Sequence, residues 1–260
     1  MITPNYIRRK LHNLTHPLLG RILMLHRVTE QRSVGDNREL EVTPDFLEHT
    51  IEEYRQQGHH FVSIDEVCDI LVKGSTKQPF VCLTFDDGYQ DNYTTALPLL
   101  KRLNIPFAIY ITTGFIDNRQ PIWWYRCESR EQCQTCLSNV EVQQRERSYP
   151  NDTLGLGLDS LRALDAEPLC TICAHTISHP RLDSLSVDEQ RKEIAMSKTT
   201  LEEWLGHPVD HFSYPHGAYN EDTLAIVRDC GFHSALMAWG GTVRRGADQF
   251  LLHRIELRQL

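Results

Sequence analysis

Two adjacent carboxylates follow an apolar run in the segment LTFDDGYQDN, residues 83 to 92. The run is typical of a buried parallel strand, and Asp86 and Asp87 stand at its carboxyl end, where α/β folds place their ligands. Two buried anions one residue apart repel each other, so either a positive charge shares the site or one carboxylate is protonated. A divalent metal in the site would resolve the conflict.

Two histidines with suitable spacing follow another strand-like run, in AHTISHP. The pair His175 and His179 would suit a zincin helix, but Thr176 stands where that motif has Glu. Pro180 disfavours helical geometry at His179, so we expect the pair to bind a metal from a loop. One aspartate and two neutral imidazoles leave coordination positions open, as in a hydrolytic zinc site.

Two further pairs, Cys133-x-x-Cys136 and Cys170-x-x-Cys173, have the spacing of metal ligands and could form a four-cysteine zinc site. The second pair lies in LCTICAH, which reads as a strand whose neighbouring side chains alternate between faces. A buried cysteine behaves there as a small apolar residue. Without a signal peptide, the eight cysteines are expected to be reduced thiols. We therefore favour a structural interpretation of both pairs.

Strand-like apolar runs alternate with helical stretches along most of the chain. The runs are RILMLHRV, HFVSI, FVCLTF, PFAIYIT, LCTICAH, HFSYP and FHSALMA, starting at residues 21, 60, 80, 106, 169, 211 and 232. Helix starts are predicted at three capping residues: Thr43 before Pro44, Ser186 with Glu189 in a capping box, and Asn220. This alternation predicts either an α/β barrel or an open doubly wound sheet.

The region from about 117 to 168 departs from this rhythm, because it contains WWYRCESREQCQTC, a polar stretch and a glycine-spaced LGLGLDSLRAL. We interpret it as an insertion over one rim of the domain. No repeat with a period of about 20 to 50 residues is present, and no long low-complexity linker interrupts the chain. Residues 1–260 are therefore predicted to form a single domain.

The net charge of −8 is spread along the sequence, which argues against general affinity for nucleic acid. No apolar run approaches the ~20 residues that a membrane-spanning helix needs. Pro17 and Arg21 interrupt the apolar part of the N-terminal stretch, and no cleavage site follows. We expect a cytoplasmic protein, with peripheral membrane contact through Arg8, Arg9 and Lys10 as the alternative. The oligomeric state is not predicted.

Three motifs, TFDDG, AHTISHP and FSYPHGAYN, occur in this order and together resemble the polysaccharide deacetylase family, the NodB-homology group of carbohydrate esterases. The resemblance covers about residues 20–257. It implies a distorted (β/α) barrel of seven or so parallel strands. It also implies a hydrolase that removes acetyl groups from N-acetylated sugars of a surface glycan or its precursor. Without a secretion signal, a nucleotide-linked or lipid-linked precursor is favoured.

The same resemblance implies a role for each motif residue. Asp87, His175 and His179 would hold the metal, and Asp86 would be the general base that takes a proton from the attacking water. The backbone N–H of Tyr214 would stabilise the oxyanion. Zinc is the favoured metal, while cobalt, nickel and iron stay open because they use the same nitrogen and oxygen ligands.

The general acid is assigned to His26 in LMLHRV, because some relatives carry the acid on an N-terminal strand in a circularly permuted barrel. The alternative is His253 in FLLHRIEL, although that segment reads as a closing strand. The aromatic residues Trp123, Trp124 and Tyr125 leave two interpretations open. They either stack on a sugar ring or close the rim of the barrel.

The third motif departs from the family pattern, since the arginine that usually pairs with the catalytic aspartate is missing from Ser213, Tyr214, Pro215 and His216. No Asp-Trp segment that would orient the acid is evident either. The altered third motif motivates a second hypothesis, a noncatalytic glycan-binding module that retains a metal. An amidohydrolase of the same fold that acts on another amide is the third.

Overall fold

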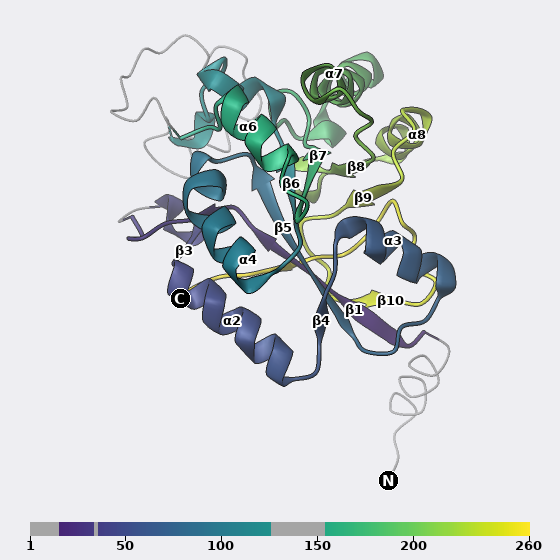
Figure 1. The fold of residues 1–260 in the computed structure, drawn as a ribbon. Helices are drawn as coiled ribbons and strands as arrows, with labels where there is room; N and C mark the ends of the chain where they lie inside the picture. The colour runs from purple at the N-terminus through teal and green to yellow at the C-terminus, as the bar shows by residue number, and fades with distance from the viewer. Residues whose placement is uncertain (1–15, 34–35, 126–153) are drawn as a thin grey trace.

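The computed structural model describes residues 16–33, 36–125 and 154–260 (Figure 1). Its main sheet carries parallel strands in the order β1 (Leu18–Leu25), β5 (Phe80–Asp87), β6 (Phe107–Ile111), β7 (Cys170–Ala174), β8 (His211–Ser213) and β9 (Ser234–Leu236). Every residue of β5 and β6 is buried, as continuous apolar runs predict for strands covered on both faces. β4 (His60–Phe61) pairs with β5, and β10 (Val243–Arg244) runs antiparallel to β1.

The C-terminal segment closes this curled sheet. β11 (Ile255–Glu256) lies parallel to β1, and Leu252 forms a parallel bridge with Leu236 of β9. Residues 252–256 therefore lie between the last and first strands of the sheet. The predicted distorted (β/α) barrel is confirmed by this arrangement. A separate two-stranded sheet pairs β2 (Arg27–Val28) with β3 (Glu41–Val42).

The helices alternate with the strands as the capping signals indicate. They are α2 (Pro44–Gln56), α3 (Ile64–Lys73), α4 (Leu97–Leu103), α6 (Leu158–Asp165), α7 (Val187–Leu205) and α8 (Glu221–Asp229). Short helical turns are η1 (Asp36–Leu40), η2 (Asn92–Ala96), η3 (Thr113–Asn118), η4 (Trp123–Tyr125), η6 (Leu182–Ser184) and η7 (Pro215–Gly217). Thr43, Ser186 and Asn220 cap α2, α7 and α8, the last two in capping boxes. All three predicted helix starts are thus confirmed.

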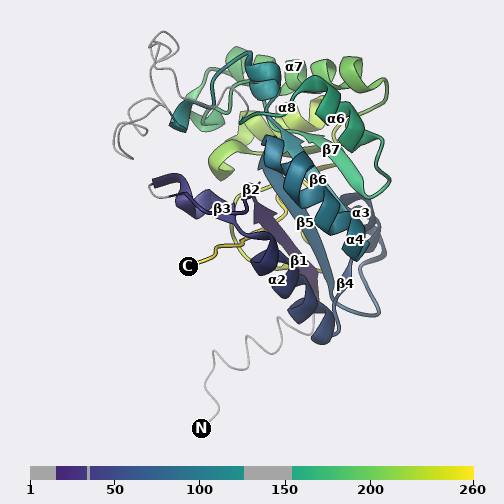
Figure 2. The ribbon, with the colours of Figure 1, turned by 60° about the vertical axis from the view of Figure 1, so that its left-hand side comes forward.

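Two hydrophobic clusters hold the layers together. The larger one joins one face of the sheet to α2, α4, α6, α7 and α8, which surround the sheet in Figures 1 and 2. The smaller one joins the other face to α3, through Ile64 and Val67. Because parallel strands are covered on both faces, their carboxyl ends are left as the open edge for a site.

The region predicted as an insertion, 117–168, contains part of the barrel itself. α6 lies between β6 and β7 in the chain and contacts β7, so it is the crossover helix of a β-α-β unit. Residues 126–153, with Cys133 and Cys136, lie outside the described residues. Cys170 and Cys173 of β7 pack into different clusters, as a spacing of three in a strand requires. These two side chains therefore do not face a shared metal.

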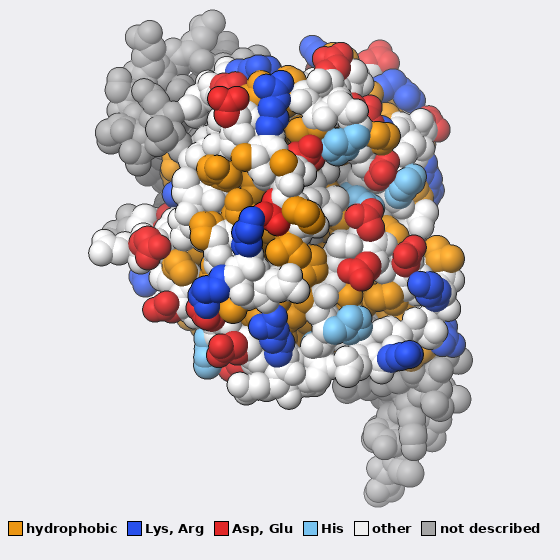
Figure 3. Space-filling model, in the orientation of Figure 1, with side chains coloured by type: hydrophobic (Ala, Val, Ile, Leu, Met, Phe, Trp, Pro, Cys, Tyr) orange, Lys and Arg blue, Asp and Glu red, His pale blue; other side chains and the backbone are white. Residues whose placement is uncertain are grey.

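Among the described residues, no helix is long and apolar enough to span a membrane. On the face shown in Figure 3, acidic and basic side chains are interspersed, and no single basic surface stands out. The C-terminal end of the chain lies beside the start of α2, where the Thr43 N–H donates a hydrogen bond of 2.8 Å to Gln259 Oε1. This hydrogen bond holds the C-terminal segment against α2 beyond β11.

Candidate active site

The carboxyl ends of the parallel strands bring the sequence motifs to one edge. In the sheet register Asp87 pairs with Ile111 and Ala174 pairs with Phe212. The N–H of His175, the residue after β7, donates 2.9 Å to the Ile111 carbonyl, so its loop starts level with the end of β5. The first and second motifs, far apart in sequence, therefore share one edge.

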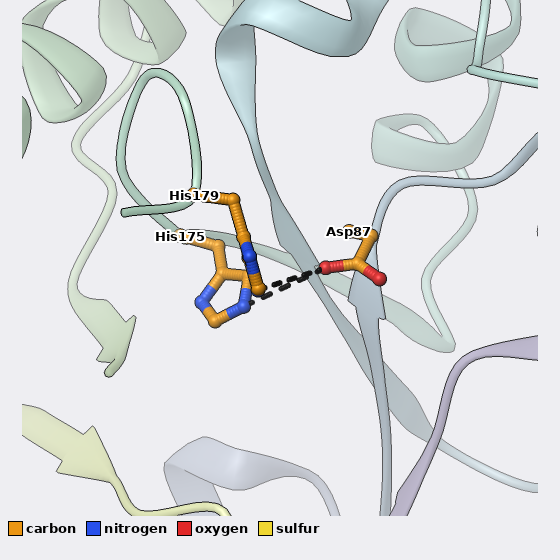
Figure 4. Close-up of side chains that lie close together, drawn as sticks. All are labelled: Asp87, His175 and His179. Atoms are coloured by element: carbon orange, nitrogen blue, oxygen red, sulfur yellow. Dashed lines mark ion pairs between the residues drawn. The ribbon is translucent and has the colours of Figure 1, made fainter. Parts of the chain in front are cut away.

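Asp87, His175 and His179 form a buried cluster that fits a metal (Figure 4). Nε2 of His179 lies 3.4 Å and Nε2 of His175 lies 3.7 Å from Oδ1 of Asp87. Asp87 is only 1% exposed, and its Oδ1 has no hydrogen-bond partner within the described part of the chain. An unpartnered buried carboxylate oxygen facing two imidazole nitrogens has the donor set and spacing that a divalent metal requires.

The protonation states also suit a metal. Nδ1 of His175 lies 2.8 Å from the Ser213 carbonyl, which can only accept, so the proton sits on Nδ1 and Nε2 keeps its lone pair toward Asp87. Burial lowers the pKa of His175 to about 4, against the opposing charge of Asp86. Burial and the neighbouring His216 and His175 hold the pKa of His179 well below its usual range. Both imidazoles are thus neutral ligands at neutral pH.

The backbone around the cluster is strained. Asp87, Thr176 and His179 have φ of +77°, +66° and +60°, in the left-handed region that residues with a Cβ avoid. At Asp87 this conformation ends the strand alternation that would direct Asp86 and Asp87 to opposite faces. As a result, Nε2 of His175 lies within 3.9 Å of Asp86 Oδ2 as well as near Asp87. Strain of this kind persists only where surrounding contacts hold it.

One such contact comes from Glu193 on α7, which sequence reasoning missed. Its Oε2 accepts hydrogen bonds from the N–H groups of Ile177 and Ser178 at 2.9 and 3.0 Å. Its Oε1 accepts from the Ser178 hydroxyl at 2.7 Å. One carboxylate therefore holds the middle of the loop between His175 and His179, and so supports the backbone that carries both imidazoles.

Replacing Glu193 with glutamine should weaken metal binding by about 10-fold to 100-fold, the usual cost of losing a residue that orients a ligand. Glutamine offers only one acceptor oxygen, and its NH₂ group would face the N–H or hydroxyl groups of the loop, which are themselves donors. The dissociation constant for Co²⁺, measured by calorimetric titration, checks this. The matched control is Glu189→Gln on the same helix, which removes a capping-box carboxylate remote from the loop. Equal loss of affinity in both variants would contradict the positioning role.

Asp86 forms a buried ion pair with Arg254, a second residue that sequence reasoning missed. Two guanidinium nitrogens, Nη1 and Nη2, donate to Oδ1 and Oδ2 of Asp86, both at 2.7 Å. Arg254 is 1% exposed, and its remaining donors reach the Met237 carbonyl at 2.7 Å, the Ser213 hydroxyl at 2.8 Å and the Thr84 hydroxyl at 3.2 Å. The arginine absent from the third motif is thus supplied by the closing segment.

The two neighbouring aspartates differ in protonation because their surroundings differ. Burial raises the pKa of Asp86, but the charge and the hydrogen bonds of Arg254 outweigh burial and bring that pKa below its usual value. Burial and the negative charge of Asp86 hold the pKa of the Asp87 carboxyl well above its usual range. Asp86 is therefore ionised at neutral pH, and a further positive charge beside Asp87 would favour the ionised form of that carboxyl too. A bound metal would supply that charge.

The structure separates the two candidates for the general acid. His26 directly follows β1, whose Leu25 pairs with Phe85 of β5, so the ring lies at the same edge as Asp86. Burial lowers the pKa of His26, and the charge of Asp86 opposes that shift. His253 is exposed, and its Nδ1 lies 3.1 Å from the Trp239 carbonyl. His26 is therefore the better placed imidazole.

Tyr214 does not offer the free amide that the sequence interpretation assigned to it. Its N–H donates 3.0 Å to the Leu236 carbonyl in the pairing of β8 with β9. Its hydroxyl donates 3.0 Å to the Phe250 carbonyl. Both polar groups are engaged within the fold, so we withdraw the oxyanion role from this residue.

The aromatic segment η4 lies against the metal-ligand cluster. The rings of Trp124 and His179 have centroids 4.9 Å apart, and Trp123 lies 6.5 Å from His179. Trp124 Nε1 donates 2.9 Å to the Tyr89 hydroxyl, and Tyr125 accepts 3.2 Å from Arg27. Trp124 and Tyr125 thus close the rim through buried contacts. Trp123 packs edge-to-face on Trp124, with ring centroids 5.0 Å apart.

Comparisons with known proteins agree with this geometry. The family model described as polysaccharide deacetylase matches residues 73–235. YxkH of Bacillus subtilis (strain 168), named as a polysaccharide deacetylase, is 24% identical over 237 residues, 91% of this chain and 70% of YxkH. The solved deacetylase PplD of Streptococcus pyogenes, in complex with acetate, has a TM-score of 0.68 and 24% identity over 92% of each chain. IcaB from Ammonifex degensii has a TM-score of 0.72 and 21% identity over 92% of each chain.

Proposed function

Because this chain belongs to the polysaccharide deacetylase family, we propose that it is a metal-dependent hydrolase acting on N-acetylated sugars. Its substrate would be a surface glycan or a precursor of one. The observation that carries the proposal is the cluster of Asp87, His175 and His179 with an ionised Asp86 beside it. A metal-binding module needs the first three residues. Asp86 also lies 3.9 Å from the imidazole of His175, where an ionised carboxylate is placed to accept a proton in turnover.

Each side chain would have a distinct task in amide hydrolysis. A divalent metal held by Asp87, His175 and His179 would act as a Lewis acid, lowering the pKa of water and polarising the amide carbonyl. Asp86 accepts the proton of the water whose oxygen adds to the carbonyl carbon. Arg254 fixes both oxygens of Asp86 through its paired hydrogen bonds, so the carboxylate keeps one orientation.

His26 would protonate the amine nitrogen as the C–N bond breaks, which yields acetate and a free amino sugar. Burial keeps this imidazole neutral in the free protein at neutral pH, because it lowers the pKa of His26. The acid role therefore requires His26 to take up a proton when substrate binds, and the negative charge of Asp86 favours that uptake.

The motive for a noncatalytic module was the third motif, which lacks an arginine. Arg254 removes that motive, since it forms with Asp86 the pair that the motif was expected to supply. An amidohydrolase acting on another amide stays compatible with the same residues. We place it second, because the family model that matches residues 73–235 is described as polysaccharide deacetylase.

The proposal is tested by measuring acetate release from N-acetylated sugar oligomers and nucleotide sugars. The protein would be stripped of metal with a chelator and then reloaded with Zn²⁺ or Co²⁺. We expect activity to disappear on stripping and to return on reloading. Tight metal binding without acetate release from any substrate would shift the assignment to another amide or to a binding module.

A further inference from the structure

Trp239 is an exposed indole with no packing role to explain it. The residue is 60% exposed, whereas every other Phe, Tyr and Trp of the described residues is buried or half-buried. Burying a large apolar side chain fully stabilises a protein by about 1.5–3 kcal/mol, and this side chain forgoes most of that. A tryptophan left in water at a ligand-binding edge of a fold is typical of a contact residue.

The position of Trp239 links it to the catalytic carboxylate. It follows β9 on the edge that carries the site, two residues after Met237. The Met237 carbonyl accepts a hydrogen bond of 2.7 Å from Arg254 Nε, and the same guanidinium binds Asp86. Two residues of extended chain span about 7 Å. Because Trp239 follows β9 in the chain, its backbone lies at the edge of the sheet that carries the site, just beyond the contact between Met237 and Arg254.

The backbone that presents this indole is fixed. Nδ1 of His253 lies 3.1 Å from the Trp239 carbonyl, and the Gly241 N–H lies 3.4 Å from the Arg254 carbonyl. Gly240 has φ of +126°, and a Cβ there would lie 1.9 Å from Nδ1 of His253, so only glycine fits. A contact residue held in this way loses little conformational freedom when it binds.

A second indole stands on the same rim, nearer to the metal-ligand cluster. The ring of Trp123 lies 6.3 Å from that of His216 in the third motif. Gly217, the residue after His216, packs on Ala238, the residue before Trp239. A Cβ added at Gly217 would lie 3.1 Å from the Ala238 nitrogen. The third-motif loop thus connects the two indoles along one rim.

We infer that Trp239 stacks on a sugar unit next to the one that loses its acetyl group, and so sets a preference for chain length. The inference rests on the proposed function. The C–H face of a pyranose ring packs on the face of an indole, whose π-system is negative. Trp123, whose ring lies 6.5 Å from that of His179, is placed for the reacting sugar, and Trp239, on the other side of the third-motif loop, for its neighbour. A single N-acetylated sugar or a nucleotide sugar would leave Trp239 without a partner.

Calorimetric binding of N-acetylglucosamine and its β-1,4-linked and β-1,6-linked oligomers, with the metal-loaded protein, tests this inference. Wild-type protein should bind one oligomer series at least about tenfold more tightly than the monosaccharide. Trp239→Ala should lose that gain and leave monosaccharide affinity unchanged, while Trp239→Tyr should restore part of it. The control is Val72→Ala, which shortens another exposed apolar side chain, on α3.

Three results would overturn the inference. Trp239→Ala could bind oligomers like wild type, it could lose monosaccharide and oligomer affinity equally, or wild type could show no gain with length in either series. Acetate release, measured on the same samples, separates this failure from failure of the proposed function. Oligomer binding that depends on Trp239 without any acetate release would remove the function and keep the sugar contact.

Discussion

Asp86→Asn should lower kcat/KM for acetate release by about 10²-fold to 10⁴-fold, the usual contribution of a general base. Asparagine keeps the size of the side chain, but it cannot accept the proton of the attacking water. Metal affinity should change far less, since the carboxylate of the cluster is that of Asp87. Acetate release and Co²⁺ affinity, measured on the same preparation, check both parts.

The same substitution removes the negative partner of Arg254 and leaves a buried guanidinium without compensation. We therefore expect the free energy of unfolding to fall, by up to about 3–5 kcal/mol, which urea unfolding would measure. Asp248→Asn is the control, because it breaks an exposed pair with Arg228 at 3.0 Å. Full activity in a folded Asp86→Asn protein would exclude Asp86 as the base. Loss of metal with activity would assign it to the metal instead.

Local signals in the sequence predicted the strands and helices, whereas the choice of a barrel over an open sheet came from the family resemblance. The largely apolar run before Asp86 indicated a strand covered on both faces, and the caps at Ser186 and Asn220 fix where helices begin. The meeting of Asp87 with His175 follows from parallel topology, which brings strand ends to one edge. These features depend on residues close in sequence or on the fold class alone.

The missed parts depend on tertiary pairing. Arg254 reaches Asp86 across 168 positions of the chain, and no local pattern encodes that partner. One signal was available in FLLHRIEL, because strand alternation puts Arg254 on the same face as the apolar Leu252, and an arginine on a buried strand face needs a carboxylate. The amide of Tyr214 was misassigned because a motif does not reveal which N–H groups the pairing of β8 with β9 uses.

Arg254→Ser should be among the most destabilising single substitutions in this protein. It leaves Asp86 buried and unpaired, which costs about 3–5 kcal/mol, and it vacates the space of a large buried side chain. Losing the guanidinium charge should also raise the pKa of Asp86. The acid limb of the kcat/KM profile should therefore move to higher pH, because the base is protonated over a wider range.

Stability should change with pH in a defined direction. In the wild type the pKa of Asp86 in the folded state is below its value of about 3.9 in the unfolded state. The ionised pair therefore stabilises the fold above pH ~3.9. This contribution is lost as the pH falls through the pKa of the folded state. In Arg254→Ser the folded pKa rises, and stability is lost as pH increases instead. The difference in unfolding free energy between the two proteins should therefore be larger at pH 7 than at pH 4, as urea unfolding at each pH would show.

Moving the arginine from position 254 to position 213 tests whether Asp86 needs its partner from the closing segment. Ser213 Oγ lies 2.8 Å from Nη2 of Arg254, so an arginine placed on β8 by Ser213→Arg has the Asp86 carboxylate within reach once residue 254 is small. We expect the double variant Ser213→Arg with Arg254→Ser to recover part of the free energy of unfolding that Arg254→Ser loses. Its acid limb in kcat/KM should also move back toward the wild-type pH. Ser213→Arg alone, which crowds two guanidinium groups into one buried site, should be destabilised. A double variant no better than Arg254→Ser would show that Asp86 needs its arginine from the closing segment, with the contacts to Met237 and Thr84 that only this strand provides.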